Sequence, residues 1–212
     1  MDYIAGTRRN PFGHDPPCEQ FVPGYGVTTA DFHVVGDHPG VHGGRETGIP
    51  FTDQEWSADF FDALRRGGLV EHVDLTEGVV DGDRVFFSYL HLCDPGTEVP
   101  DDSDYAALEP FFDSELRAIT ADVLFPVGRR ATAHVLDTYT PRSAESVDMA
   151  AVHATEVQGA GWLVVPIKDP GAWSGDDAVN LVDSLRALQQ TDFRRIADLG
   201  RFSPDEDPYF VR

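Results

Sequence analysis

Four short apolar segments alternate with amphipathic stretches along the chain. The apolar segments cover residues 31–35, 84–93, 122–127 and 162–167. Stretches with apolar positions three and four residues apart follow them, at about 53–66, 104–120, 128–139 and 174–190. Short apolar runs bounded by turn residues predict buried strands, and the longer periodic stretches predict helices. Pro110 lies inside the second stretch, so that helix could begin there instead.

Alternation of strands and helices predicts an α/β fold, and specifically a three-layer αβα sandwich with a mainly parallel four-stranded central sheet. Such sheets bind ligands in the crevice beyond the carboxyl ends of their strands. The loops expected to carry the chemistry are therefore residues 36–51, 89–97, 128–130 and 168–173.

The length and composition fit one domain. The chain has 212 residues, of which 41% are hydrophobic, enough for a single sizeable core. We predict one domain over residues 1–212, with an N-terminal arm at 1–28 and a C-terminal tail at 191–212.

The charge balance is strongly acidic. Lys and Arg total 16 against 37 Asp and Glu, giving a net charge of -21, and Lys168 is the one lysine. An acidic surface nearly free of lysine suits a protein dissolved in concentrated salt, where the Debye length is about 3 Å at 1 M. The charge does not exclude DNA as a partner, because binding in high salt would rely on stacking and local arginines.

The two cysteines, Cys18 and Cys93, form no CxxC motif and no disulfide framework. That cysteine usage fits a reducing cytoplasm. No apolar run reaches the roughly 18 residues of a membrane span, and no charged-then-apolar leader opens the chain. We therefore expect a cytoplasmic protein without membrane association.

The loop GDHPGVHGGRETGIPF at residues 36–51 admits several kinds of site. His38 and His42 have a spacing that serves a metal only on a helix, and the glycines and prolines argue against a helix, so we predict no metal. Glycines after a strand could cradle a phosphate, but GxxxxGK[ST] is absent. Serine hydrolase chemistry is disfavoured because no GxSxG occurs. A pocket for a planar base is the remaining alternative.

Several motifs in one order resemble the uracil-DNA glycosylase superfamily, nearest its iron–sulfur branch. Gly36-Asp37-His38-Pro39-Gly40 and Gly48-Ile49-Pro50-Phe51-Thr52 are similar to that branch's GE-x-PG and G-x-PFVG. The other matches are Val22 to Gly26, Leu92 to Gly96, Leu108 to Phe112, Val127 to Ala131 and Ile167 to Gly171.

The resemblance implies an enzyme of base-excision repair that flips a base out of DNA and cleaves its N-glycosidic bond. Phe51 would be the stacking platform for the base. Asp37 would orient water or stabilise positive charge on the sugar, and His38 could assist with the water. The alternatives are a core phenylalanine at Phe51 and loop hydrogen bonds for Asp37 and His38. The backbone rim would consist of Gly36, Pro39, Gly40, Pro170 and Gly171.

Three departures from the family pattern affect the site. Tyr89 stands where the family has the asparagine that reads the uracil edge, and a phenol offers one rotatable hydroxyl. Asp169 replaces the histidine that holds the leaving base, and its carboxylate would repel an anionic base. Adjacent Lys168 could contact a phosphate or the base instead, or form an ion pair with Asp169.

The third departure concerns the cluster, which four thiolates normally hold. Only Cys93 lies at a matching position, Leu108 replaces the next cysteine, and Cys18 stands alone on a shortened arm. We therefore predict no iron–sulfur cluster and no other cofactor.

The leading hypothesis is a monomeric, cofactor-free DNA glycosylase that acts on a flipped uracil or another deaminated or damaged base. The alternative is a non-catalytic module that binds nucleic acid or a nucleotide, with the fold kept and the chemistry lost, as Tyr89 and Asp169 would favour. A third hypothesis is a metal-dependent hydrolase using His38 and His42.

Overall fold

The computed structural model describes residues 8–140 and 147–200. A six-stranded sheet in the order β1-β5-β2-β6-β8-β7 forms its centre. The strands are β1 (Tyr25–Gly26), β2 (Phe32–Gly36), β5 (Val85–Tyr89), β6 (Val123–Pro126), β7 (Val157–Gln158) and β8 (Leu163–Val164). A separate hairpin joins β3 (His72–Asp74) to β4 (Val79–Asp81).

The four central strands are those that the apolar runs predict. Strand β2 pairs in parallel with β5 and β6, and β6 pairs in parallel with β8. The predicted strand number was too low, because β1 and β7 add antiparallel pairs at the two edges. Each edge strand has two residues, too few to produce an alternating pattern in the sequence.

The helices follow the strands in the order that the sequence indicates. They are α1 (Pro39–His42), α2 (Ser57–Arg66), α3 (Asp102–Ile119), α4 (Gly128–Tyr139), α5 (Met149–Val152), α6 (Asp177–Leu188) and α7 (Phe193–Gly200), with a 3-10 turn η1 (Pro170–Ala172). Helix α3 does not begin at Pro110. The Asp101 side chain accepts from the Ser103 and Asp104 N–H groups and fixes the start there.

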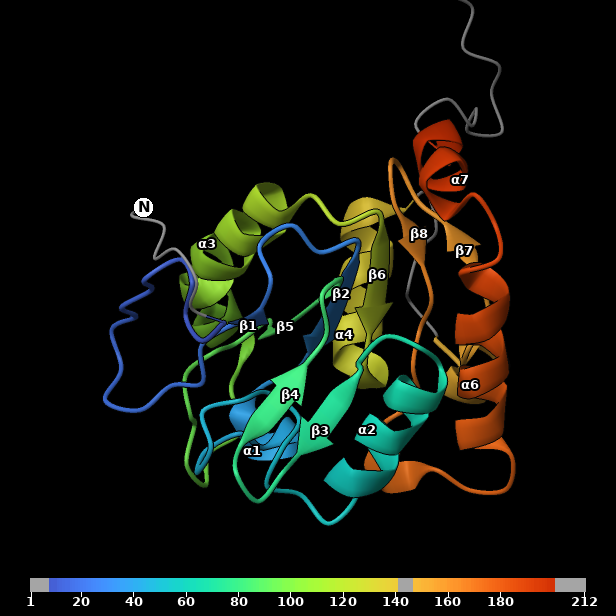
Figure 1. Ribbon diagram of the computed structural model, residues 1–212. Helices are drawn as coiled ribbons and strands as arrows, with labels where there is room; N and C mark the ends of the chain where they lie inside the picture. Colours follow the sequence, from blue (N-terminus) through green and yellow to red (C-terminus); the bar gives the residue numbers. More distant parts are fainter. Residues whose placement is uncertain (1–7, 141–146, 201–212) are drawn as a thin grey trace, which may run out of the picture.

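Different helices cover the two faces of the sheet (Figure 1), and alternate side chains of a strand are buried in different clusters. Val34 of β2 faces the cluster formed with α2, α6 and α7, whereas the next residue, Val35, faces the cluster formed with α3 and α4. This alternation is the two-residue period of a strand buried on both sides. Helix α7, within the predicted C-terminal tail, buries Phe193 and Ala197 in the first cluster. Residues 201–212 of that tail lie outside the described ranges.

The glycine-rich loop after β2 contains a short helix, so the prediction that its glycines and prolines prevent a helix was wrong. Pro39 occupies the first turn of α1, where its missing N–H costs nothing. The His38 side chain caps the helix by accepting from the Gly40 N–H at 3.0 Å. Four residues suffice for one turn, and Gly43 ends it with a positive φ of 80°.

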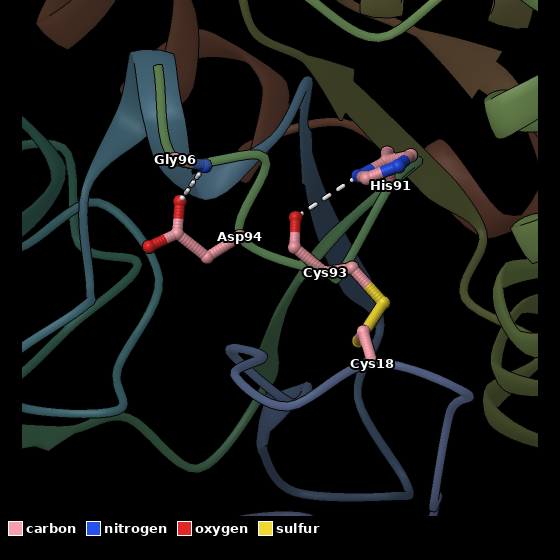
Figure 2. The surroundings of a disulfide bond; sticks show 5 residues. All are labelled: Cys18, His91, Cys93, Asp94 and Gly96. Atoms are coloured by element: carbon pink, nitrogen blue, oxygen red, sulfur yellow. Dashed lines mark hydrogen bonds between the residues drawn. A yellow bond between two sulfur atoms is a disulfide. The ribbon is translucent and has the colours of Figure 1, made fainter. Parts of the chain in front are cut away.

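Cys18 is paired with Cys93, so the expectation of an isolated Cys18 was wrong. Residues 20–22 run antiparallel to residues 92–94, with Val22 N–H donating to Leu92 O and Asp94 N–H donating to Gln20 O, both at 2.9 Å. Figure 2 shows the bond joining the N-terminal arm to the loop that carries His91 and Asp94. Disulfides are rare in reducing compartments, so this pairing removes one argument for the cytoplasm, and that location stays a prediction.

Candidate active site

The loops at the carboxyl ends of the parallel strands surround a cavity of about 480 Å³. Asp37 follows β2, Gly128 follows β6, and Asp169 lies beyond β8. The lining residues are Asp37, Val41, His42, Gly128, Arg129, Arg130, Ala133 and Asp169. This is the edge of the sheet where the alternating pattern places a ligand site.

Asp37 is held at the strand end by its neighbours on three sides. Its N–H donates to His42 Nδ1 and its carbonyl accepts from the His91 N–H, both at 3.0 Å. The Tyr105 hydroxyl donates to Asp37 Oδ1. Burial and this carboxylate raise the pKa of Tyr105, so the phenol remains a proton donor. The carboxylate of Asp37 is thereby fixed as an acceptor that faces the cavity.

Arg130 connects α4 to this arrangement. Its guanidinium lies 3.8 Å above the Tyr105 ring and its Nη2 atom is 2.6 Å from Asp102 Oδ1. A guanidinium stacked on an aromatic ring is a cation–π contact. Arg130 therefore supports the phenol that holds Asp37 and lines the same cavity.

His38 lies in the α1 loop with 7% of its surface exposed. Because its Nδ1 accepts from the Gly40 N–H, a neutral ring carries its proton on Nε2. Burial lowers the pKa of His38, opposed by the charge of Asp37. His38 and Asp37 line a second cavity of about 420 Å³, which extends to the loop at residues 96–100.

The two predicted base-binding aromatics are buried beneath the site. Phe51 is 0% and Tyr89 is 2% exposed. The Tyr89 hydroxyl accepts from the Phe51 N–H at 2.8 Å and donates to His42 O at 3.0 Å or to Gly43 O at 3.1 Å. It therefore holds together the loop that carries Phe51, whose φ is 68°. The base-binding roles of both residues stay predictions.

Gly36 is needed where these rings approach the strand end. A Cβ atom at Gly36 would lie 2.6 Å from Tyr89 Cε1 and 2.8 Å from Phe51 Cζ. Both separations are too short for carbon atoms in contact. The glycine thus lets two aromatic rings pack against the backbone just before Asp37.

Asp169 and Lys168 point to different partners. The Asp169 Oδ1 atom accepts from the Gly171 N–H at 2.9 Å, and Oδ2 lies 3.7 Å from His42 Nε2. The facing His42 ring lowers the pKa of Asp169. Lys168 Nζ is 2.7 Å from Asp177 Oδ2 at the start of α6, rather than beside Asp169. The structure brings Asp169 to the cavity and directs the lysine side chain to α6.

The other predicted rim residues shape two turns at the site. Pro39 and Gly40 belong to α1, and the Gly40 N–H is bonded to His38. Pro170 and Gly171 form η1, which the Asp169 side chain caps. Both turns are therefore fixed by the side chains of predicted catalytic residues.

Three further residues contribute to the site but are absent from the predicted set: His42, Tyr105 and Arg130. His42 entered the sequence analysis only as a candidate metal ligand. Arg130 belongs to the Gly128-Arg129-Arg130 turn, whose glycine marked the end of a strand. Tyr105 carried no signal, because its approach to Asp37 spans 68 positions of the sequence.

The start of α4 adds a local positive field to an acidic protein. Its N-cap residue, Val127, provides no side-chain hydrogen bond to the first turn. The Gly128 N–H donates to Ile167 O at 2.8 Å, whereas N–H groups without an intrahelical partner in such a turn, together with the helix dipole, favour anions. Gly128, Arg129 and Arg130 of this turn line the cavity.

The residues present do not fit a four-cysteine cluster. A cluster of that kind takes four thiolates, whereas the chain has two cysteines and these are joined to each other. Among the described residues, no group of three or more His, Cys, Asp or Glu side chains is placed to bind a metal ion. Within those ranges, no helix has the length and apolarity that a bilayer crossing requires.

A mainly parallel sheet with Asp37 and His42 beside a cavity at its strand ends defines an α/β protein with a candidate site at that edge. Residues 23–177 match the family described as the Uracil DNA glycosylase superfamily. The match covers most of the chain, and the protein therefore belongs to this superfamily.

Two individual proteins are also similar to the chain. The chain is 26% identical over 120 residues to the type-5 uracil-DNA glycosylase of Mycobacterium leprae (strain TN), covering 55% of this chain and 52% of that protein. It is 27% identical over 120 residues to the type-5 uracil-DNA glycosylase of Mycobacterium tuberculosis (strain CDC 1551 / Oshkosh), covering 55% of this chain and 44% of that protein. The matches thus span about half the length of these relatives.

Proposed function

We propose that the protein is a DNA glycosylase of base-excision repair that hydrolyses the N-glycosidic bond of a flipped uracil or another deaminated or damaged base. Superfamily membership supports the reaction class. The observation that carries the proposal is the Asp37 carboxylate, held by Tyr105 at the mouth of two cavities. A fixed carboxylate beside the sugar can stabilise developing positive charge or orient the attacking water.

We assign the residues around Asp37 roles that fit their positions. His38, next to Asp37, would hold the water through the ring nitrogen that its capping bond leaves available. Phe51 would support the base from beneath, with the His42 ring packed against it at a centroid distance of 5.3 Å. Arg129, Arg130 and the start of α4 would receive a DNA phosphate, since N-terminal helix turns bind anions.

We further propose that the protein is a monomer and binds no cofactor. With two cysteines joined in a disulfide, the chain would rely on that bond for the loop after β5. Light scattering in molar KCl should give the mass of one chain, and metal analysis should find no iron. A stoichiometric iron content would contradict the cofactor part.

The cleavage test uses oligonucleotides that contain uracil, hypoxanthine or xanthine, incubated with the protein in molar KCl. Alkaline strand scission then reports abasic sites. Asp37→Asn, which keeps the size of the side chain, should reduce the rate by about 10²–10⁴-fold. Folded wild-type protein that releases no base from any of these substrates would refute the proposal.

A non-catalytic binding module is the second candidate. The Tyr89 hydroxyl and the Lys168 ammonium group are both engaged in internal bonds, so neither is set to read a base. Titration of single-stranded DNA or free bases, followed by tryptophan fluorescence, distinguishes the two functions. Binding without release of a base would favour the module.

A further inference from the structure

His42 lies at the floor of the candidate site in a defined orientation. Its Nδ1 atom accepts from the Asp37 N–H at 3.0 Å. In the neutral ring the proton therefore resides on Nε2. The ring packs on Phe51 at 5.3 Å and stacks on Tyr89 at 6.3 Å with an interplanar angle of 27°. These contacts leave the imidazole a single donor, Nε2–H.

That donor has no hydrogen-bond partner within the described part of the chain, although His42 is 1% exposed. Asp169 Oδ2 is 3.7 Å from Nε2, beyond hydrogen-bond length. A buried donor without a partner bears the full desolvation penalty of its N–H group. Native proteins rarely keep such a group unless a ligand or another function uses it.

His42, Gly128 and Asp169 line one cavity. A Cβ atom at Gly128 would lie 3.5 Å from His42 Nε2 and 3.9 Å from Asp169 Oδ2. Because residue 128 is glycine, with a φ of 79°, the space beside both groups stays open. A donor and an acceptor thus stand side by side on one wall.

We propose that His42 Nε2–H donates to a carbonyl oxygen of the bound base while Asp169 accepts from the adjacent ring N–H. The site would then read an edge with a carbonyl beside an N–H, as uracil, hypoxanthine and xanthine present. This assignment rests on the proposed glycosylase function and makes His42 a catalytic residue of that reaction.

The chemistry balances without proton transfer from His42. When the N-glycosidic bond breaks, its electron pair moves onto the base and spreads to the carbonyl oxygen. Water forms the new bond to C1′ and loses a proton, and the base anion takes a proton from solvent. His42 keeps its own proton throughout, because Nδ1 stays occupied by the Asp37 N–H. A fixed hydrogen-bond donor that faces the developing negative charge stabilises the transition state, as in an oxyanion hole.

Two substitutions separate this role from a structural one. In His42→Asn, the amide oxygen occupies the place of Nδ1 and can still accept from the Asp37 N–H, but the distal donor is lost. In His42→Gln, the amide reaches the place of Nε2 and can still donate, whereas the proximal acceptor is lost. His72→Asn, at an exposed position of β3, is the matched control.

Single-turnover cleavage with saturating protein should fall about 10²–10³-fold in His42→Asn, with much of the rate kept in His42→Gln. A merely structural role predicts the reverse order, with the greater loss of melting temperature in His42→Gln. A folded His42→Asn variant that cleaves at the wild-type rate would overturn the assignment and leave the glycosylase function standing.

A readout independent of turnover covers the case in which no base is released. In protein labelled with 15N-histidine, the His42 signals should show the Nε2–H tautomer and shift when free uracil or hypoxanthine is added. The His72 signals should stay in place. A His42 signal that free bases leave unmoved would refute the assignment, whatever the cleavage assays show.

Discussion

Loss of the Cys18–Cys93 disulfide should lower the free energy of unfolding by about 4 kcal/mol. The bond closes a loop across a sequence separation of 75. For a loop of that length, the chain-entropy relation gives about 4.5 kcal/mol at 25 °C, near the upper end of measured values. At about 2–4 °C per kcal/mol for a domain of this size, the melting temperature should fall by about 8–16 °C.

The assay is thermal unfolding in molar KCl, followed by circular dichroism, with and without a reductant. The Cys18→Ser/Cys93→Ser protein serves as the control, because a reductant should leave its melting temperature unchanged. Thiol titration of the unfolded chain establishes how many cysteines are free. Two free thiols before reduction would refute the pairing. An unchanged melting temperature after complete reduction would refute the entropy argument.

Three other substitutions test separate parts of the structure. Burial raises the pKa of Glu115 from 4.5 to about 8. The free energy of unfolding should therefore be greatest below pH 4.5 and decline as the pH rises through 8, by at most about 1.4 kcal/mol per pH unit. Denaturant titrations of Glu115→Gln should lack this decline. Tyr89→Phe leaves the Phe51 N–H unpaired and should cost about 1–3 kcal/mol, seen as a lower denaturant midpoint with an unchanged slope. Asp169→Leu should lower kcat/KM for uracil by about 10–100-fold, since it removes an ionised acceptor; an unchanged value would contradict its contact with the base.

The central strands were predictable because each lies in an apolar run bounded by turn residues, at 31–35, 84–93, 122–127 and 162–167, and the main helices because each is long enough to show its period. The loop after β2 was misjudged, since a proline at the first turn and a histidine cap outweigh the low helix propensity of its glycines. The edge strands and the disulfide depend on pairings between distant segments, such as residues 20–22 with 92–94. No local pattern reports such pairings.

The candidate site was predictable to a similar degree. The motifs placed Asp37 and Asp169 after two predicted strands, and the structure brings both to one cavity. Tyr105 and His42 could not be assigned from the sequence, because their roles depend on an atom that each directs at Asp37. Lys168 is the one lysine of the chain, which suggested a role in the site. Its side chain instead pairs with Asp177, nine positions away at the start of α6.

The interlock of Gly36 with Phe51 and Tyr89 also constrains how this site can evolve. A methyl group at position 36 would clash with both rings, so a substitution there requires smaller side chains at both of the other positions. Effects of such changes should be strongly non-additive, since contacting residues couple. Evolution of a differently shaped pocket would therefore need coordinated substitutions at positions 36, 51 and 89. The neighbouring Asp37 would keep its own hydrogen bonds to His42, His91 and Tyr105.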